Sequence, residues 1–339
     1  MTASSKGNSG ARRAVLVVGL VAVVLAALLT GAWFYAAREI DRRTGEAIAA
    51  AAANGATIDC AGRETFGYPF RIGLSCSAVG VDAPSAELRA TGGALRTAAQ
   101  IYDPGRIVAE LDGPLFLDTR DLPPLDLRWE LAQASLRFGF GGLQRGSLSV
   151  RAPDVALAQP AGDRLPVAVA DRFELHLRGA DGNLDFASTD RGLRFVLPAL
   201  ASLPAMEASF DLSVTGAEGW LASGMPRGTA REVLGGREGV LRSARVDAGM
   251  AGLELSGPWR VSPDGLLSGE FRLAIAEPQQ VADIIAAILP DFAPIANQTA
   301  SAVGFFGVRE NGRSVLPLTV KDGAATLGVV PLGRIPPLE

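Results

Sequence analysis

The stretch RFELHLRGADG, residues 172–182, indicates the kind of fold that this chain adopts. Phe173, Leu175 and Leu177 alternate with charged or polar residues, which is the period-two pattern of a strand with one buried face. The Asp181-Gly182 dipeptide that follows is typical of a tight turn between antiparallel strands. This segment therefore predicts a half-buried antiparallel strand that leads into a hairpin.

The same alternation recurs along most of the chain. Phe210, Leu212 and Val214 alternate in SFDLSVTG, and similar runs with further Asp-Gly or Asn-Gly turns continue to the C-terminal region. No series of strand–helix–strand units is present, so a parallel sheet is not expected. We predict a mainly β protein with an elongated, curved antiparallel sheet. Its candidate apolar face consists of Phe173, Leu175, Leu177, Phe210, Leu212 and Val214.

Helices are expected only sparsely after residue 54. Pro278–Leu289 has an apolar stripe at helical spacing, with a proline in the first turn and Pro290 as the stop. A weaker helical pattern lies at residues 229–234. We therefore predict one amphipathic helix in the C-terminal half that covers a face or an end of the sheet.

The N-terminal region contains an apolar segment at residues 14–37 that has no charged residue. At 1.5 Å per residue it is long enough to cross about 30 Å of hydrocarbon. Lys6, Arg12 and Arg13 precede it, and basic residues stay on the cytoplasmic side. The sequence predicts a cytoplasmic tail (1–13) and a single-pass anchor in a bacterial inner membrane, with the bulk in the periplasm. A cleaved signal peptide is the alternative, because Thr30-Gly31-Ala32 offers small residues for cleavage.

The helix is expected to continue beyond the membrane as a stalk at residues 38–54. Ile40, Thr44, Ile48 and Ala51 recur at helical spacing, with Ala47 on the same side, and Asn54-Gly55 forms a stop. We expect this stripe to dock on the following domain; a freely solvated spacer is the alternative. No clear linker divides residues 55–339, which we interpret as one extracytoplasmic β-rich domain.

The two cysteines, Cys60 and Cys76, are predicted to form a structural disulfide. Outside the cytoplasm disulfides form readily. A hairpin centred on Tyr68 would place Cys60 opposite Cys76, within the range that a disulfide spans. The alternatives are two buried thiols or a reactive cysteine, but no CxxC motif and no neighbouring Lys or His is present.

Several segments together resemble the uncharacterised bacterial envelope family known as domain of unknown function (DUF) 2125. They are GAWFYAA at 31–37, GYPFRIGLSC at 67–76, residues 93–114 around AQIYDP, and LPLTVKDGAATLGVVPLGRIPPL at 316–338. This family has no assigned activity, so the resemblance implies neither a reaction nor a cofactor for this chain. The chain is also distantly similar to AsmA-like envelope proteins, which implies a membrane anchor and a groove-forming sheet linked to lipid transport.

The family-like hairpin motif consists of Gly67, Tyr68, Pro69, Phe70 and Arg71. Such a segment is expected to be a turn whose aromatic rings pack into the core, with Arg71 paired or exposed. Binding of a partner by this motif is the alternative.

The sequence offers little catalytic chemistry. The chain has 339 residues, 48% of them hydrophobic, and a net charge of −4, which argues against nucleic acid as a partner. One His and two Cys cannot complete a four-ligand zinc site. His176 lies on the polar face of its strand, and Asp112, Asp118, Asp121 and Asp126 are expected in solvated loops. We assign no catalytic residue, metal or cofactor, and we expect the protein not to be an enzyme.

Three functions remain compatible with these observations. The first is an envelope protein that binds or shields lipid on an apolar β surface. The second is a scaffold that uses the same sheet to bind an envelope protein without lipid. The third is a membrane-tethered hydrolase, which would require converging carboxylates that the sequence does not locate.

Overall fold

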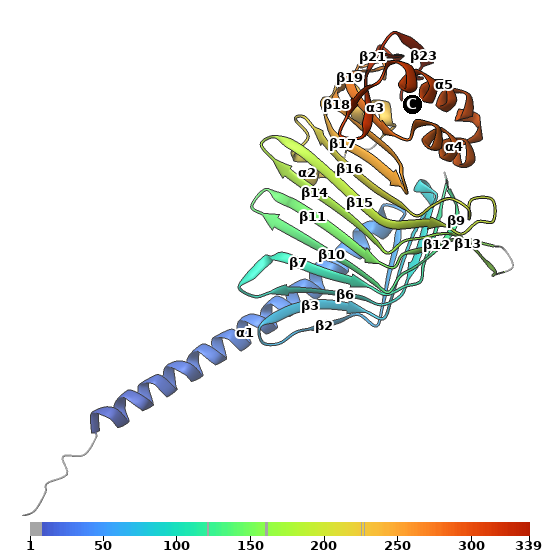
Figure 1. The fold of residues 1–339 in the computed structure, drawn as a ribbon. Coiled ribbons are helices and arrows are strands. Elements are labelled where there is room, and N and C mark those ends of the chain that lie inside the picture. Colours follow the sequence, from blue (N-terminus) through green and yellow to red (C-terminus); the bar gives the residue numbers. More distant parts are fainter. Residues whose placement is uncertain (1–8, 121, 160–161, 225, 227) are drawn as a thin grey trace, which may run out of the picture.

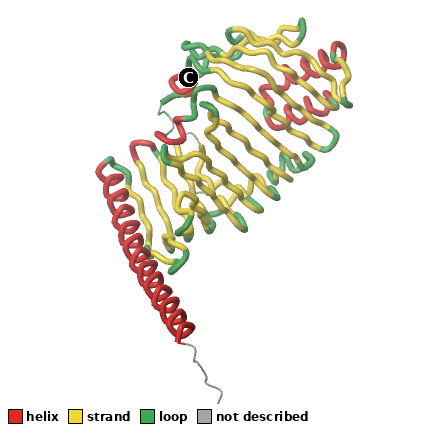
Figure 2. The backbone as a smooth tube through the Cα atoms, turned by 90° about the vertical axis from the view of Figure 1, so that its left-hand side faces the viewer, coloured by secondary structure: helices red, strands yellow, loops and turns green. Residues whose placement is uncertain are grey.

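We describe a computed structural model of the chain, covering residues 9–339 except 121, 160, 161, 225 and 227. As predicted, one long N-terminal helix is followed by a large antiparallel β structure, and a few shorter helices lie within and after it (Figures 1 and 2). The helices are α1 (Ser9–Ala53), η1 (Pro84–Ala86), α2 (Gly219–Ser223), α3 (Ala230–Leu234), α4 (Pro278–Ile288), η2 (Pro290–Phe292) and α5 (Ala293–Phe306).

The strands follow one another along the whole body of the protein. They are β1 (Thr57–Ala61), β2 (Glu64–Phe66), β3 (Arg71–Cys76), β4 (Ala78–Ala83), β5 (Leu88–Gly92), β6 (Leu95–Gln100), β7 (Asp103–Leu111), β8 (Leu115–Thr119), β9 (Leu122–Arg128), β10 (Leu131–Gly139), β11 (Gly142–Arg151), β12 (Asp154–Ala158), β13 (Arg164–Val169), β14 (Arg172–Ala180), β15 (Asn183–Phe195), β16 (Met206–Val214), β17 (Glu238–Ala248), β18 (Ala251–Val261), β19 (Leu267–Ala276), β20 (Val308–Glu310), β21 (Arg313–Lys321), β22 (Ala324–Leu327) and β23 (Val330–Arg334).

The pairings define a large sheet and a small sheet. The large sheet has the order β2-β3-β6-β7-β10-β11-β14-β15-β16-β17-β18-β19-β21. Beyond β21 lie β20 and β22, with β23 outside β22. The small sheet has the order β1-β4-β5-β8-β9-β12-β13. All of these pairings are antiparallel.

The two sheets meet along a common seam, where the chain passes from one sheet to the other within at most three residues. Examples are Ser77 between β3 and β4, and Ala152-Pro153 between β11 and β12. β15 crosses the seam as one strand, pairing with β14 and then, through Arg194 and Phe195, with β13. Gly192 marks this bend, because its φ is +67° and a Cβ there would lie 2.2 Å from Asp171 Oδ2. The small sheet therefore folds back toward one face of the large sheet (Figure 1).

α1 contains both the apolar segment and the predicted stalk. It is long and apolar enough to cross a membrane and, as predicted, continues without a break to Ala53. Ile40, Thr44, Ile48 and Ala51 are partly buried whereas Ala47 is exposed. The C-terminal part of α1 contacts β1, β2 and β3, and Asp41 forms an ion pair with Arg63 at 3.0 Å. The stalk is therefore docked and is not a solvated spacer.

The C-terminal helices differ in part from the prediction. α4 matches the expected amphipathic helix, and α3 lies at the weaker pattern, where Thr229 forms a capping box with Glu232. The prediction of a single amphipathic helix in this half is nevertheless wrong, because α5 packs beside α4. α5 was missed because small residues such as Ala296 and Ala300 form its packed face, which gives only a weak apolar pattern.

Candidate functional site: an apolar groove between two sheets

The predicted apolar residues share one face of the large sheet. Leu177 pairs with Phe186, which pairs with Leu212, and Leu175 and Phe210 lie on either side of Ser188 in the neighbouring row. The rings of Phe186 and Phe210 meet edge to face at 5.7 Å. The register places Phe173 and Val214 on the same face, where Val214 is buried. All six residues therefore form one continuous surface across β14 to β16.

The half of this face nearer to α1 forms one wall of an apolar groove. The groove encloses about 500 Å³, which is within the range of ligand pockets. Each wall contributes a row of paired residues. The rows are Ala132, Val150 and Phe173 on the large sheet, and Leu115, Leu127 and Val155 on the small sheet.

Helices lie at both ends of the apolar face. At one end α1 contacts β1 of the small sheet and β2 and β3 of the large sheet. At the other end, Val281 of α4 and Val303 of α5 pack on Leu273 and Ile275 of the large sheet. The C-terminal half of the face is thus covered by the chain's own helices (Figure 1). The groove is lined by residues from β6 to β15, in the half nearer to α1.

Asp190 is an acidic side chain in the apolar lining of the groove. It lies on β15 opposite Phe173. Its Oδ1 atom is buried and has no hydrogen-bond partner among the described residues. Burial disfavours the charged form and raises the pKa of this carboxyl above its ordinary value of 3.8. Asp190 is therefore a polar position in the groove at which burial shifts the carboxyl toward its neutral form.

This raised pKa makes the stability of the protein depend on pH. The folded state holds the Asp190 proton more tightly than the unfolded state, so stability falls as pH rises from about 4 through the folded pKa. We expect Asp190→Asn to gain thermal stability relative to the wild type at pH 7, with the gain disappearing toward pH 3.5. Differential scanning fluorimetry of both proteins across this range measures it. A difference that is independent of pH would contradict a raised pKa.

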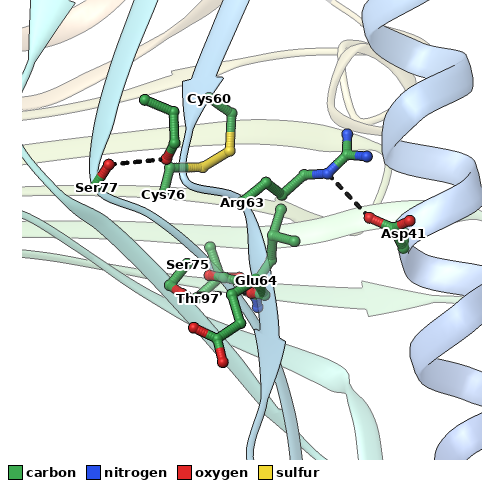
Figure 3. Close-up of a disulfide and its surroundings, with 10 residues drawn as sticks. Asp41, Cys60, Arg63, Glu64, Ser75, Cys76, Ser77 and Thr97 are labelled. Atoms are coloured by element: carbon green, nitrogen blue, oxygen red, sulfur yellow. Dashed lines mark hydrogen bonds and ion pairs between the residues drawn. A yellow bond between two sulfur atoms is a disulfide. The ribbon is translucent and has the colours of Figure 1, made fainter.

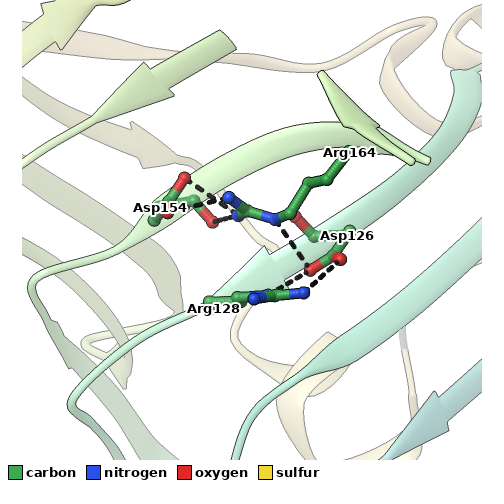
Figure 4. Close-up of polar contacts among 4 residues, drawn as sticks. All are labelled: Asp126, Arg128, Asp154 and Arg164. Atoms are coloured by element: carbon green, nitrogen blue, oxygen red, sulfur yellow. Dashed lines mark hydrogen bonds and ion pairs between the residues drawn. The ribbon is translucent and has the colours of Figure 1, made fainter. Parts of the chain in front are cut away.

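A cluster of four charged residues lies on the small sheet, where two of its members, Arg128 and Asp154, also line the groove (Figure 4). Asp126 pairs with Arg128 at 3.0 Å and with Arg164 at 3.3 Å, and Arg164 pairs with Asp154 at 2.9 Å. Burial opposes ionisation of Asp126, but the two arginines outweigh it and lower its pKa. Two acids balance two bases, so this cluster is a neutral ion-pair network.

The prediction that Asp126 lies in a solvated loop is therefore wrong. It belongs to β9 of the small sheet and is only 4% exposed. The prolines at 123 and 124 suggest an irregular segment, but the structure has a strand there. Asp112 is exposed and paired with Arg96 at 2.5 Å, and Asp118 is exposed on β8. Asp121 lies outside the described residues. Asp112 and Asp126 are therefore each tied to arginine, and Asp118 lies at the surface.

The opposite face of the large sheet is polar. His176 is exposed there and its Nδ1 lies 3.1 Å from Ser147 Oγ. Arg178 and Arg242 each pair with Asp185 at 2.7 Å. Burial opposes ionisation of Asp185, but these hydrogen bonds prevail and lower its pKa to about 2. The described residues contain no group of three His, Cys, Asp or Glu that could hold a metal ion.

The predicted disulfide between Cys60 and Cys76 is present, with Cα atoms 5.2 Å apart (Figure 3). The predicted register around it is wrong. Thr65 pairs with Leu74, so the β2–β3 hairpin is centred between Pro69 and Phe70. Cys60 lies on β1 of the small sheet and Cys76 at the end of β3 in the large sheet. The disulfide therefore links the two sheets across the seam, close to α1.

The hairpin motif also differs from the expectation that its aromatic rings pack into the core. Tyr68 and Phe70 are 54% and 65% exposed. The ring of Tyr68 contacts Trp33 of α1 at 5.5 Å between ring centres. Arg71 is exposed, and its carbonyl accepts a hydrogen bond from Trp33 Nε1 at 2.7 Å. Gly67 has φ of +109° and Pro69 follows a cis peptide bond, as suits a tight turn.

Sequence reasoning missed the small-sheet wall of the groove. Its signal is present in the alternation of Leu115 and Leu117 and of Leu125 and Leu127, but the pattern does not say which sheet a strand joins. The linker Trp129-Glu130 has the length of a hairpin turn. It nevertheless connects β9 of the small sheet to β10 of the large sheet.

Comparison with known protein families gives a match over most of the chain. The family model for DUF2125, described as an uncharacterized protein conserved in bacteria, matches residues 33–336. These residues include the end of α1, both walls of the groove and both cysteines. No curated protein matches the chain. The chain therefore belongs to the DUF2125 family of uncharacterized bacterial proteins.

Proposed function

We propose that this protein is a membrane-anchored envelope protein that shields the acyl chains of a lipid in the groove. In this proposal α1 spans the bacterial inner membrane, and residues 38–339 lie in the periplasm. The observation that carries the proposal is the apolar groove itself, whose walls come from two sheets and whose volume of about 500 Å³ is open to a ligand. Contiguous apolar surface left open in this way marks an interaction site.

The energetics favour an acyl chain as the occupant. Each methylene removed from water contributes about 0.8 kcal/mol, so a chain that buries eight of them gains about 6 kcal/mol. The groove also lies in the half of the large sheet nearer to α1, and α1 contacts the edge strands of both sheets. A lipid in the groove would therefore lie close to the bilayer that supplies it.

Binding and not catalysis is the proposed activity. Asp126, Asp154 and Asp185, which lie near the groove or on the polar face, are each paired with arginine, whereas Asp190 stands in the groove without an arginine partner among the described residues. Paired carboxylates with a lowered pKa, such as Asp126 and Asp185, are poor general acids at neutral pH.

Mass spectrometry of the lipids and proteins that remain with the detergent-purified full-length chain tests this proposal. We expect a bound lipid in a defined ratio to protein. A stable protein partner without any lipid would contradict the proposal and favour an interaction scaffold on the same sheet.

The proposed orientation rests on the basic residues before the apolar segment and on the disulfide, which forms in oxidising compartments. We expect an alkaline phosphatase fusion at the C-terminus of the full chain to be active, because this enzyme needs an oxidising compartment. An inactive fusion, together with an active cytoplasmic reporter at the same site, would contradict the orientation.

A further inference from the structure

We propose that the β domain itself enters the bilayer interface through an aromatic tip. We define the aromatic tip as Tyr68 and Phe70 in the β2–β3 turn and Tyr102 in the β6–β7 turn. These side chains are 54%, 65% and 78% exposed. The partner is the lipid headgroup layer of the same membrane that α1 crosses. This inference rests on the membrane anchoring in the proposed function, but not on a lipid in the groove.

Direct contacts fix the position of the tip along α1. The Thr30 hydroxyl donates to the Ala26 carbonyl at 2.8 Å, and so it accepts from the Tyr68 hydroxyl, 2.9 Å away. Trp33 is only 8% exposed and packs its ring against Tyr68. The β2–β3 turn is thus held at the level of residues 30–33 of the helix.

This level lies inside or at the edge of the hydrocarbon core. With the core beginning at Ala14, the first residue after Arg13, Thr30 lies about 24 Å along the helix axis at 1.5 Å per residue. The hydrocarbon core is about 30 Å thick and ends near Phe34. A side chain that bonds to Thr30 cannot remain in bulk water while the helix spans the bilayer. Tyr68 therefore lies at the boundary between acyl chains and headgroups.

The second turn lies next to the first. The amide of Ile101 donates to the Phe70 carbonyl at 3.1 Å, and Arg71 pairs with Gln100 in the adjoining strands. The turn that carries Tyr102 therefore lies beside Phe70. Figure 1 shows both turns at the end of the sheet where α1 leaves it.

The chemistry of the tip suits a membrane interface. Tyrosine and tryptophan favour the headgroup level because one end of the ring system is apolar and the other is polar. Arg38 and Arg71 are exposed near this level, and neither has an ion pair among the described side chains. Exposed arginines beside an aromatic belt match the phosphates of lipid headgroups. Trp33 of α1 and the aromatic tip of the β domain together form an aromatic belt at this level.

Fluorescence quenching by brominated lipids tests the inference on the full-length chain in lipid nanodiscs. The probe is the variant Tyr102→Trp, a change at an exposed turn. The emission of Trp33 is obtained by subtracting the emission of the variant Trp33→Phe from that of the wild type. We expect phosphatidylcholine brominated on its acyl chains to quench the emission of the indole added at position 102 about as strongly as that of Trp33. The matched control is Phe140→Trp, whose position is fully exposed in the β10–β11 turn, one hairpin further along the large sheet than the β6–β7 turn. Its added emission is expected to remain unquenched.

Three results would overturn the inference, and they are distinguishable. Quenching of Trp33 without quenching at position 102 would show that the anchor is inserted but that the tip stays in water. Absence of quenching at Trp33 itself would refute the membrane anchoring on which both this inference and the proposed function rest. Equal quenching at positions 102 and 140 would show that the β domain lies on the membrane nonspecifically and not through this tip.

Discussion

Replacement of Ala134 by tryptophan is expected to weaken lipid binding by about 50-fold. Ala134 lines the groove on β10, where it pairs with Leu148 of β11. An indole at this position fills part of the space that an acyl chain would occupy. If it excludes three methylenes, the loss is about 2.4 kcal/mol, at about 1.4 kcal/mol per tenfold change in affinity. Titration of the detergent-purified full-length protein with a fluorescent fatty acid measures the effect.

The matched control is Ser135→Trp. Ser135 is the next residue of the same strand, and side chains alternate between the two faces of a sheet. The same bulky residue therefore points away from the groove, and we expect affinity close to that of the wild type. Equal affinity of both variants and the wild type would show that the groove is not where the chain binds.

Removal of the disulfide is expected to have the largest effect on stability. In the double variant Cys60→Ala/Cys76→Ala, the loss of a crosslink that closes a loop of about 16 residues lowers the free energy of unfolding by about 3 kcal/mol. The crosslink joins the two sheets at the seam, so its loss also loosens the small-sheet wall beside α1. The thermal unfolding midpoint of the full-length protein measures the change.

Reduction provides the internal control for this variant. Dithiothreitol should lower the midpoint of the wild type to that of the double variant and leave the double variant unchanged. An unfolding midpoint that neither treatment alters would contradict a structural role for the disulfide.

The strands and the long apolar helix could be predicted because each has a local cause. Alternation at Phe173, Leu175 and Leu177 follows directly from the pleat of a strand, and an uncharged segment of 24 residues has the length of a membrane span. Both patterns require only residues near one another in the sequence. The same local rule predicts which apolar residues share one face of the sheet.

The groove could not be predicted because it depends on contacts between distant segments. A period-two pattern tells which face of a strand is buried but not what covers it. Leu127 and Ala132 lie five residues apart, yet they belong to opposite walls because the chain crosses the seam between them. In the sequence, Asp190 is an ordinary polar residue of a predicted strand. In the structure it lies opposite Phe173 and lines the groove between the two sheets.

The disulfide shows how a correct pairing can follow from a wrong register. Symmetry about Tyr68 brings the cysteines together in a simple hairpin, whereas in the structure β1, which carries Cys60, pairs with β4 in the small sheet. The cysteines meet because two sheets converge at the seam. The turn positions Tyr68 and Phe70 were expected in the core for the same reason, since no local pattern reveals that α1 passes beside that turn.

Photocrosslinking with a phospholipid that carries a diazirine in the middle of one acyl chain tests the central claim most directly. The full-length protein would be labelled in nanodiscs and its modified peptides identified by mass spectrometry. We expect labelling of groove peptides that contain Leu127, Leu148 and Val150, and loss of this labelling in Ala134→Trp but not in Ser135→Trp. Labelling confined to residues 14–37 of α1 and the aromatic tip, with none in the groove, would contradict the claim that the groove holds lipid.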